Sequence, residues 1–261
     1  MFVRTIIIST LCLAFSSCSS QEPGWKLVWS DEFDYTGLPD PSKWTYDTGY
    51  IANNEKQYYT ESRTENARVE DGHLIIEARK EKWEGFDYTS ARLVTRETAT
   101  WTYGRFETRA KLPTGTGTWP AFWMLGTNIR EVGWPACGEI DIMENVGFDP
   151  KVVHGYVHTE AYNHTKGTQR GSSVKLDRPW EEFHLYAVEW FDDRIDFFVD
   201  DHKYFTFEKE SDNDDVWPFD KPHYLLLNLA IGGNWGGQQG IDDSIFPQQY
   251  IVDYVKVYEW R

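Results

Sequence analysis

Short alternating or continuously apolar runs recur along nearly the whole chain and limit its fold class. The runs are rich in Val, Ile, Tyr, Phe and Trp and are separated by Gly, Pro, Asn and Asp, the residue types that favour strands and turns respectively. No segment combines a sustained helical period with capping residues. Many strands without intervening helices predict an all-β fold, a two-sheet antiparallel β-sandwich (jelly roll) with a concave cleft. The predicted strands are 73–79, 91–95, 103–112, 121–125, 139–144, 153–159, 183–191, 194–199, 224–231 and 251–259.

One domain accounts for most of the chain. Its 261 residues, 40% hydrophobic and 16% aromatic, suit one large β domain better than two small ones. After residue 24 there is no second linker, low-complexity stretch or internal repeat, so residues 25–261 are predicted to form a single domain. Asp200-Asp201, which lies between two apolar runs, predicts a tight hairpin turn.

The first residues are typical of an export signal. Arg4 precedes an apolar stretch, residues 6–15, that is too short to span a bilayer. The Ser-Ser-Cys sequence ending at Cys18 then resembles a bacterial lipobox, although a phenylalanine stands where leucine is usual. We predict a lipoprotein-type signal peptide over residues 1–18, lipid attached to Cys18, and a short polar tether over residues 19–24. An ordinary signal peptide cut near the same place is the alternative.

Charge and cysteine content restrict partners and chemistry. With 42 acidic and 26 basic residues the formal charge is -16, which repels nucleic acid and sulfated polysaccharides at long range but does not affect neutral glycans. If Cys12 leaves with the signal and Cys18 is acylated, only Cys137 remains in the folded domain. We therefore predict no disulfide there, and stability must come from core size or from a bound ion.

The sequence Gly-Glu-Ile-Asp-Ile-Met-Glu-Asn at residues 138–145 contains three closely spaced acids. Alternation places Glu139 and Asp141 on one face of a strand and both isoleucines in the core. Strict alternation would turn Glu144 to the opposite face, but one extra residue, a β-bulge around Met143, would return it to the face of the other acids. Three like charges on one strand face destabilise a sheet. We therefore interpret these acids as functional.

Two carboxylates that flank a bond are what glycoside hydrolysis requires. With the bulge, the α-carbons of Glu139 and Glu144 lie roughly 13 Å apart at ~3.3 Å per strand step, and two glutamate side chains leaning together can approach the about 5 to 5.5 Å that retaining enzymes need. Asp141 could hydrogen-bond a neighbouring glutamate, and its charge would raise that glutamate's pKa. The alternative, a calcium site, does not explain isoleucines where calcium loops carry Gly and Asn.

The same motif, preceded by Trp134-Pro135, resembles the catalytic signature of glycoside hydrolase family 16, in the bulged form of bacterial laminarinases. The resemblance implies a retaining endo-β-1,3-glucanase acting on laminarin-like chains, with Glu139 as nucleophile, Glu144 as acid/base and Asp141 as the assisting residue. The spacing argument independently makes the two glutamates the outer pair. Further matching segments cover nearly the whole mature chain, at residues 29–33, 53–60, 103–107, 119–125, 232–235 and 252–258.

Aromatic side chains are the predicted sugar-binding surface, because the chain has 13 tryptophans and sugar rings pack on aromatic faces. Four of them flank Gly- and Pro-rich turns or the acidic strand, whereas Trp101, Trp180, Trp190 and Trp260 are predicted to lie in the core or at its rim. Asn53 and Arg92 are predicted to contact the substrate only because the resemblance implies it. The predicted substrate contacts are Asn53, Arg92, Trp119, Trp123, Trp134, His158 and Trp235.

Metal binding has two candidate sites. His154 and His158 share one face of a predicted strand, but a zinc pair lacks a third ligand with a suitable pattern, so we favour a polar role for His158. The resemblance implies no cofactor for catalysis and one structural calcium, held by Glu32, Gly72 and Asp253. Residues 212–215 lack the Gly and terminal Glu of an EF-hand loop and predict a solvated turn.

Other functions remain as alternatives. A mixed-linkage β-1,3/1,4-glucanase would use the same mechanism, and residues 236–240 replace a proline-containing loop expected in many laminarinases. Agarase- or carrageenase-like specificity fits the acidity less well. A non-catalytic, lectin-like module would gain nothing from three clustered acids. We predict a monomer that binds neutral β-glucan, contacts membrane only through the lipid, and is exported to the outer membrane, facing the periplasm or the exterior; secretion is the alternative.

Overall fold

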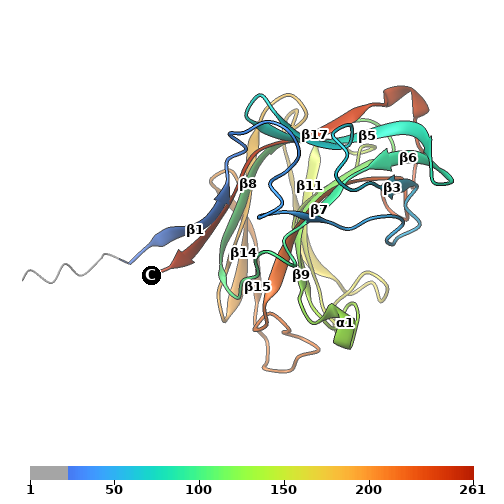
Figure 1. The fold of residues 1–261 in the computed structure, drawn as a ribbon. Coiled ribbons are helices and arrows are strands. Elements are labelled where there is room, and N and C mark those ends of the chain that lie inside the picture. Colours follow the sequence, from blue (N-terminus) through green and yellow to red (C-terminus); the bar gives the residue numbers. More distant parts are fainter. Residues whose placement is uncertain (1–22) are drawn as a thin grey trace, which may run out of the picture.

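Two antiparallel sheets stack on each other in the computed structural model, which describes residues 23–261 (Figure 1). The first sheet contains, in spatial order, β15 (His202–Glu208), β14 (Arg194–Val199), β13 (His184–Trp190), β8 (Gly104–Lys111), β17 (Gln248–Trp260), β5 (His73–Trp83), β6 (Phe86–Ser90) and β3 (Gln57–Tyr59), with β1 (Trp25–Asp31) on β17 and β4 (Ala67–Glu70) on β5. Only β3 and β6 pair in parallel within it.

The second sheet has seven strands and carries the three acids. Its order is β12 (Arg170–Lys175), β11 (Val152–His158), β10 (Glu139–Asn145), β9 (Thr118–Gly126), β16 (His223–Ile231), β7 (Arg92–Val94) and β2 (Thr45–Tyr46). The short elements α1 (Ile129–Val132) and η1 (Asp243–Ile245) lie outside the sheets. The predicted two-sheet antiparallel sandwich is therefore confirmed.

The main core lies between the sheets because each strand turns its apolar side chains inward. Ile140 and Ile142 of β10 are fully buried, as are Tyr186 and Val188 of β13 in the opposite sheet. Among the tryptophans predicted for core or rim, Trp190 is fully buried. Trp101 packs against the core, Trp180 is half-buried, and Trp260 is 56% exposed at the end of β17.

A smaller apolar cluster covers part of the outer face of the seven-stranded sheet. Leu125 on β9 and Leu226 on β16 point outward, where they pack with Cys137 and with Ile129 of α1. Cys137 is free and fully buried. The segment that contains α1 therefore packs on this outer face through Ile129 and Trp134.

Each strand predicted from the sequence overlaps an observed one, and the Asp200-Asp201 turn joins β14 to β15 as expected. The pattern did not indicate β1, β2, β3, β4, β6 or β12. β12 reads Arg-Gly-Ser-Ser-Val-Lys and lies at a sheet edge. An edge strand can remain largely exposed, so it needs no apolar alternation that a sequence search would detect.

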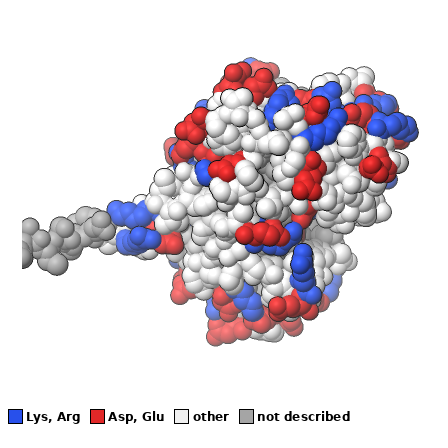
Figure 2. All heavy atoms as spheres, in the orientation of Figure 1, with Lys and Arg blue, Asp and Glu red and all other residues white. Residues whose placement is uncertain are grey.

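Charged side chains of both signs are interspersed over the face seen in Figure 2. In the described part of the chain, Lys209 pairs with Asp212 and Lys221 with Asp214, and residues 212–215 form the exposed turn that was predicted. Within residues 23–261, no helix has the length and apolar character needed to span a bilayer. The predicted signal peptide (1–18), the lipid site at Cys18 and most of the tether lie outside the described residues.

Candidate active site

A bulge in β10 gathers the three acids on the outer face of its sheet. Against β9, Asp141 pairs with Trp123 and Met143 with the next residue, Phe122, so one residue of β10 is extra. Against β11 the register also shifts between Asp141 and Glu144. Met143 is fully buried in the core. The predicted bulge is confirmed, and it returns Glu144 to the face that carries the other two acids.

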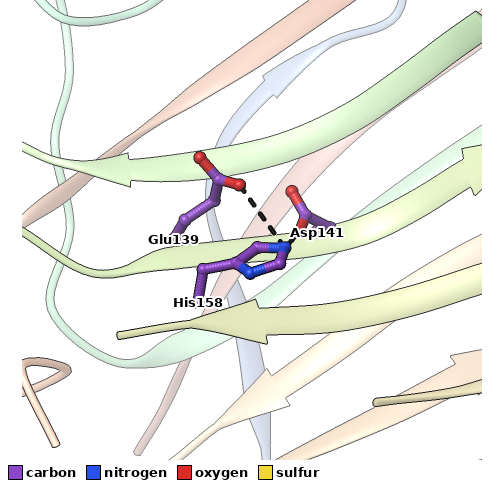
Figure 3. Close-up of side chains that lie close together, drawn as sticks. All are labelled: Glu139, Asp141 and His158. Carbon is purple, nitrogen blue, oxygen red and sulfur yellow. Dashed lines mark ion pairs between the residues drawn. The ribbon is translucent and has the colours of Figure 1, made fainter. Parts of the chain in front are cut away.

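His158 of β11 reaches into the acid cluster (Figure 3). Its Nε2 lies 3.3 Å from Oδ2 of Asp141 and 3.8 Å from Oε1 of Glu139. The imidazole is almost fully buried, as are the carboxyl groups of Asp141 and Glu144. A protonated His158 would therefore offset part of the negative charge of Glu139 and Asp141.

Each outer glutamate accepts a hydrogen bond from a tryptophan indole. Trp134 Nε1 donates to Glu139 Oε2 at 3.1 Å, and Trp119 Nε1 donates to Glu144 Oε1 at 2.9 Å. The two indoles come from different segments, Trp134 from the loop after α1 and Trp119 from β9. Because an indole N–H can only donate, each bond fixes the direction of one carboxylate and stabilises its ionised form.

Burial and mutual repulsion raise the pKa of the carboxyl groups. Burial, followed by the charge of Asp141, raises the pKa of Glu139 to about 8 and that of Glu144 to about 8. Burial raises the pKa of Asp141 well above its usual range. Three carboxyl groups this close in a poorly hydrated site cannot all be ionised. The site therefore retains protons at neutral pH.

The surroundings distinguish the two outer glutamates. Among the described residues, His158 forms an ion pair with Glu139 at 3.8 Å and none with Glu144, although its charge lowers the pKa of both carboxyl groups. A nucleophile must be ionised, while a general acid must hold a proton. This difference supports Glu139 as the anionic partner and Glu144 as the proton carrier.

Two of the predicted substrate contacts, Arg92 and Trp123, lie together on the same outer face. The Arg92 guanidinium carbon is 4.7 Å from the Trp123 ring centroid, and its Nε is 3.2 Å from Oδ2 of Asp47. Trp123 Nε1 donates to Asn228 Oδ1 at 2.7 Å. Asp47 thus holds Arg92, and Asn228 holds Trp123, which lies on the strand next to the acids.

Trp235 and Asn53 border the site from loops. The Trp235 ring is 5.7 Å from that of Trp119 and 4.9 Å from that of His154. The Asn53 carbonyl accepts the backbone N–H of Asn234, the residue before Trp235. Since Trp119 bonds Glu144, these aromatic rings extend the site next to the proposed proton carrier.

Three residues of the site were missed in the sequence. Tyr156 lies opposite Asp141 and alternates with His154 and His158, a period-two signal that could have identified it. Asn228 is a lone amide within the buried apolar run of β16, a second usable signal. Glu55 lies in a loop whose sequence has no periodicity, and its place in the family-like segment 53–60 was the available signal.

The described residues contain one group of three possible metal ligands, formed by Glu139, Asp141 and His158, with ligand atoms within 4.8 Å of one another. This group is the acid cluster itself. His154 lies outside it and packs against Tyr156 and Trp235. The structure therefore does not bring His154 and His158 together with a third ligand in the way that zinc requires.

The side chains predicted to bind calcium pair with basic residues. Glu32 Oε2 lies 3.1 Å from Lys256 Nζ, and Asp253 Oδ2 lies 2.6 Å from Arg109 Nη1. Gly72 occupies the turn between β4 and β5 with a φ of 76°. A calcium ion bound by these two carboxylates would have to replace both ion pairs, whereas one bound by backbone carbonyl oxygens would not.

Comparison with known proteins places this geometry among carbohydrate-active enzymes. The family described as glycosyl hydrolases family 16 matches residues 54–256. A beta-glucanase of Rhodothermus marinus is 56% identical over 268 residues, covering 99% of this chain and 93% of that protein. A glucan endo-1,3-beta-glucosidase of Cryptopygus antarcticus is 38% identical over 274 residues, covering 96% and 97%. The X-ray structure of the laminarinase from Rhodothermus marinus matches with a TM-score of 0.89 at 58% identity, covering 92% of this chain and 99% of that one.

Proposed function

The chain belongs to glycosyl hydrolase family 16, and we propose that it is a retaining endo-β-glucanase that hydrolyses β-1,3 linkages in neutral, laminarin-like glucans. It is a glycoside hydrolase, and glucanases of this family need no cofactor for catalysis. The observation that carries the proposal is the placement of Glu139 and Glu144 on one face, each bound by an indole, with Asp141 and His158 beside them.

Double displacement assigns a role to each acid. The Glu139 carboxylate attacks the anomeric carbon while Glu144 donates its proton to the departing glycosidic oxygen, which leaves a covalent glycosyl-enzyme. Glu144 then removes a proton from water, which attacks the same carbon and releases Glu139. Asp141, whose high pKa keeps a proton in the cluster, limits the negative charge around the two glutamates.

The pH dependence follows from the proton on Glu144. We expect kcat/KM to fall as the pH rises through about 8, because ionisation of Glu144 removes the general acid. The pKa of Glu139 is also raised to about 8, so protonation of the nucleophile should lower the rate as the pH falls below that value, and the two limbs together predict a narrow, bell-shaped profile. The measurement is a pH–rate profile on laminarin, with circular dichroism at each pH to show that the protein stays folded. A rate that remains constant well above pH 8 would contradict the assignment.

Neutral β-1,3-glucan is the substrate that the chain's relatives and charge favour together. The Cryptopygus antarcticus relative is a glucan endo-1,3-beta-glucosidase, and the formal charge of -16 disfavours sulfated polymers. The test is linkage analysis of products from laminarin, lichenan and barley glucan. Rapid depolymerisation of laminarin supports the proposal, whereas activity on none of the three polymers contradicts it.

Mixed-linkage glucan is the second candidate. The Rhodothermus marinus relative is named a beta-glucanase without a stated linkage. In the rim loop, an added Cβ on Gly236 would lie 2.9 Å from Cβ of Trp119 and one on Gly237 would lie 2.6 Å from the Gly233 carbonyl oxygen. Residues 236 and 237 therefore pack against Trp119 and the Gly232-Gly233 turn with no room for a side chain, and this tight glycine turn stands where many laminarinases are expected to have a proline-containing loop. Cleavage of β-1,4 linkages in lichenan, identified by linkage analysis of the products, would establish this activity.

Attachment to a membrane is proposed from Cys18. The acylated cysteine would hold the enzyme at the bacterial outer membrane as a monomer, with the domain joined by residues 19–24. Mass spectrometry of the mature protein tests this directly. A diacylglyceryl-modified Cys18 is the expected N-terminus, whereas an unmodified N-terminus near this position would indicate ordinary secretion.

Calcium is proposed as a stabilising ion between Glu32, Gly72 and Asp253. Because a ligand that binds only the folded state stabilises it, calcium at about 100 times its Kd would add about 2.7 kcal/mol, or a Tm increase of about 5 to 10 °C for a domain of this size. The measurement is Tm in calcium against Tm in EDTA. Asp253→Asn should abolish the difference, and an equal Tm in both buffers would disprove the site.

A further inference from the structure

A continuous hydrogen-bond chain runs beneath the proposed sugar-binding surface. Trp123 Nε1 donates to Asn228 Oδ1 at 2.7 Å, and Asn228 Nδ2 is 3.2 Å from the Tyr59 hydroxyl. That hydroxyl lies 3.1 Å from Oε2 of Glu55, which also accepts from Gln57 Nε2 at 2.6 Å. Each member except Trp123 is buried. None of these bonds takes part in the chemistry on the acids.

The direction of every bond in this chain is fixed by its ends. An indole N–H can only donate, so the Asn228 oxygen must face Trp123 and its NH2 group must face Tyr59. At the other end the Ile231 backbone N–H donates to Gln57 Oε1 at 2.7 Å, which turns the Gln57 NH2 group toward Glu55. Tyr59 accepts from Asn228 and therefore must donate to Glu55.

Both directions meet at Glu55. Its Oε2 accepts two bonds, and a buried group that could not accept both would leave a polar partner unsatisfied. Burial raises the pKa of Glu55, while Gln57 and the charge of Arg92 act in the opposite direction. Arg92 also stacks on Trp123. Glu55 therefore acts on both side chains, on Trp123 through the hydrogen-bond chain and on Arg92 through its charge.

We propose that Glu55 and Tyr59 are positioning residues that hold Trp123, through the amide of Asn228, in the orientation that binds the glucan. The proposal rests on the proposed function, because it assigns Trp123 and Arg92 to substrate binding. Its physical basis is pre-organisation: an indole and guanidinium already held in place lose less freedom when a sugar binds. Substrate affinity, and not the rate of bond cleavage, should therefore depend on the chain.

Tyr59→Phe tests the proposal with the smallest change. It removes the acceptor of the buried Asn228 NH2 group, so the amide is no longer held at its far side and Trp123 loses a fixed acceptor. We expect KM for laminarin to rise about 10-fold, the equivalent of one hydrogen bond, with kcat within about two-fold of wild type. Tyr250→Phe is the matched control, since Tyr250 is also fully buried and its hydroxyl makes no hydrogen bond to any residue that the structure describes. It should leave KM and kcat unchanged.

Asn228→Asp in the Tyr59→Phe background provides a rescue. A carboxylate presents an oxygen to Trp123 whichever way it turns, so the double variant should recover most of the lost affinity. The same order of affinities is expected by calorimetry with a β-1,3-gluco-oligosaccharide in the Glu139→Gln background, which lacks the nucleophile, so that this readout does not depend on turnover.

Any of four results would overturn the proposed positioning role of this hydrogen-bond chain, which we call the relay. They are an unchanged KM in Tyr59→Phe, a loss confined to kcat, an equal loss of affinity in Tyr250→Phe, or no rescue by Asn228→Asp. Failure of the proposed function is distinguishable, because the wild-type protein itself would then neither hydrolyse nor bind the glucan. An active wild type with an unaffected Tyr59→Phe variant would refute only the relay.

Discussion

Replacing Glu139 with Gln is expected to reduce laminarin hydrolysis by about 10⁴-fold or more, because the covalent step loses its nucleophile. Glutamine keeps the shape of the side chain and can still accept the Trp134 indole N–H, so the fold should persist. The measurement is kcat on laminarin, with circular dichroism and Tm to show that the variant is folded. Undiminished activity would contradict the assignment of Glu139 as the nucleophile.

A matched control separates chemistry from loss of a buried charge. Glu107 on β8 is buried and pairs with Arg105, but it lies in the ten-stranded sheet. Glu107→Gln should therefore lower stability while the folded protein retains its activity. A second check uses azide and Glu139→Gly, for which direct displacement predicts an α-glucosyl azide from a β-linked donor with a good leaving group. A β-azide product would contradict Glu139 as nucleophile.

Replacing Glu144 with Gln should have an effect that depends on the leaving group. Without a proton donor, hydrolysis of laminarin should fall about 10²- to 10⁴-fold. An aryl β-glucoside with an acidic phenol should still form the glycosyl-enzyme at a nearly normal rate, because its leaving group needs no proton. The comparison is burst kinetics on the aryl substrate against steady-state rates on laminarin. Equal losses on both substrates would contradict Glu144 as the general acid.

The same variant tests the raised pKa through stability. A carboxyl group whose folded pKa is about 8, against about 4.5 when unfolded, binds more protons in the native state between these values. Wild-type stability therefore decreases as the pH rises through this window. Glu144→Gln lacks this titration and should gain stability relative to wild type on the order of a few kcal/mol at pH 8, but none below pH 4. If the Tm of wild type and that of Glu144→Gln change with pH in the same way from pH 4 to pH 8, Glu144 does not have a raised pKa.

Sequence reasoning succeeded where the information was local. The alternation around Ile140 and Ile142 identified both the strand and its buried face, and the misplaced Glu144 required the bulge that the structure contains. It was incomplete where partners are distant. Nothing near Trp123 in the sequence indicates that its indole bonds Asn228, 105 residues away, or that Asn228 bonds Tyr59, 169 residues away.

The sequence by itself determined the all-β class, the bulge and the three acids on one face, because period-two alternation is a property of a single strand. Only the tertiary structure decided that Trp134 and Trp119 bind different glutamates, that the His158 imidazole lies against Glu139 and Asp141, and that the hydrogen-bond chain from Glu55 ends at Trp123. These contacts depend on which strands become neighbours and in what register. Sheet pairing between distant segments is settled by packing of the whole sandwich, and local pattern does not encode it.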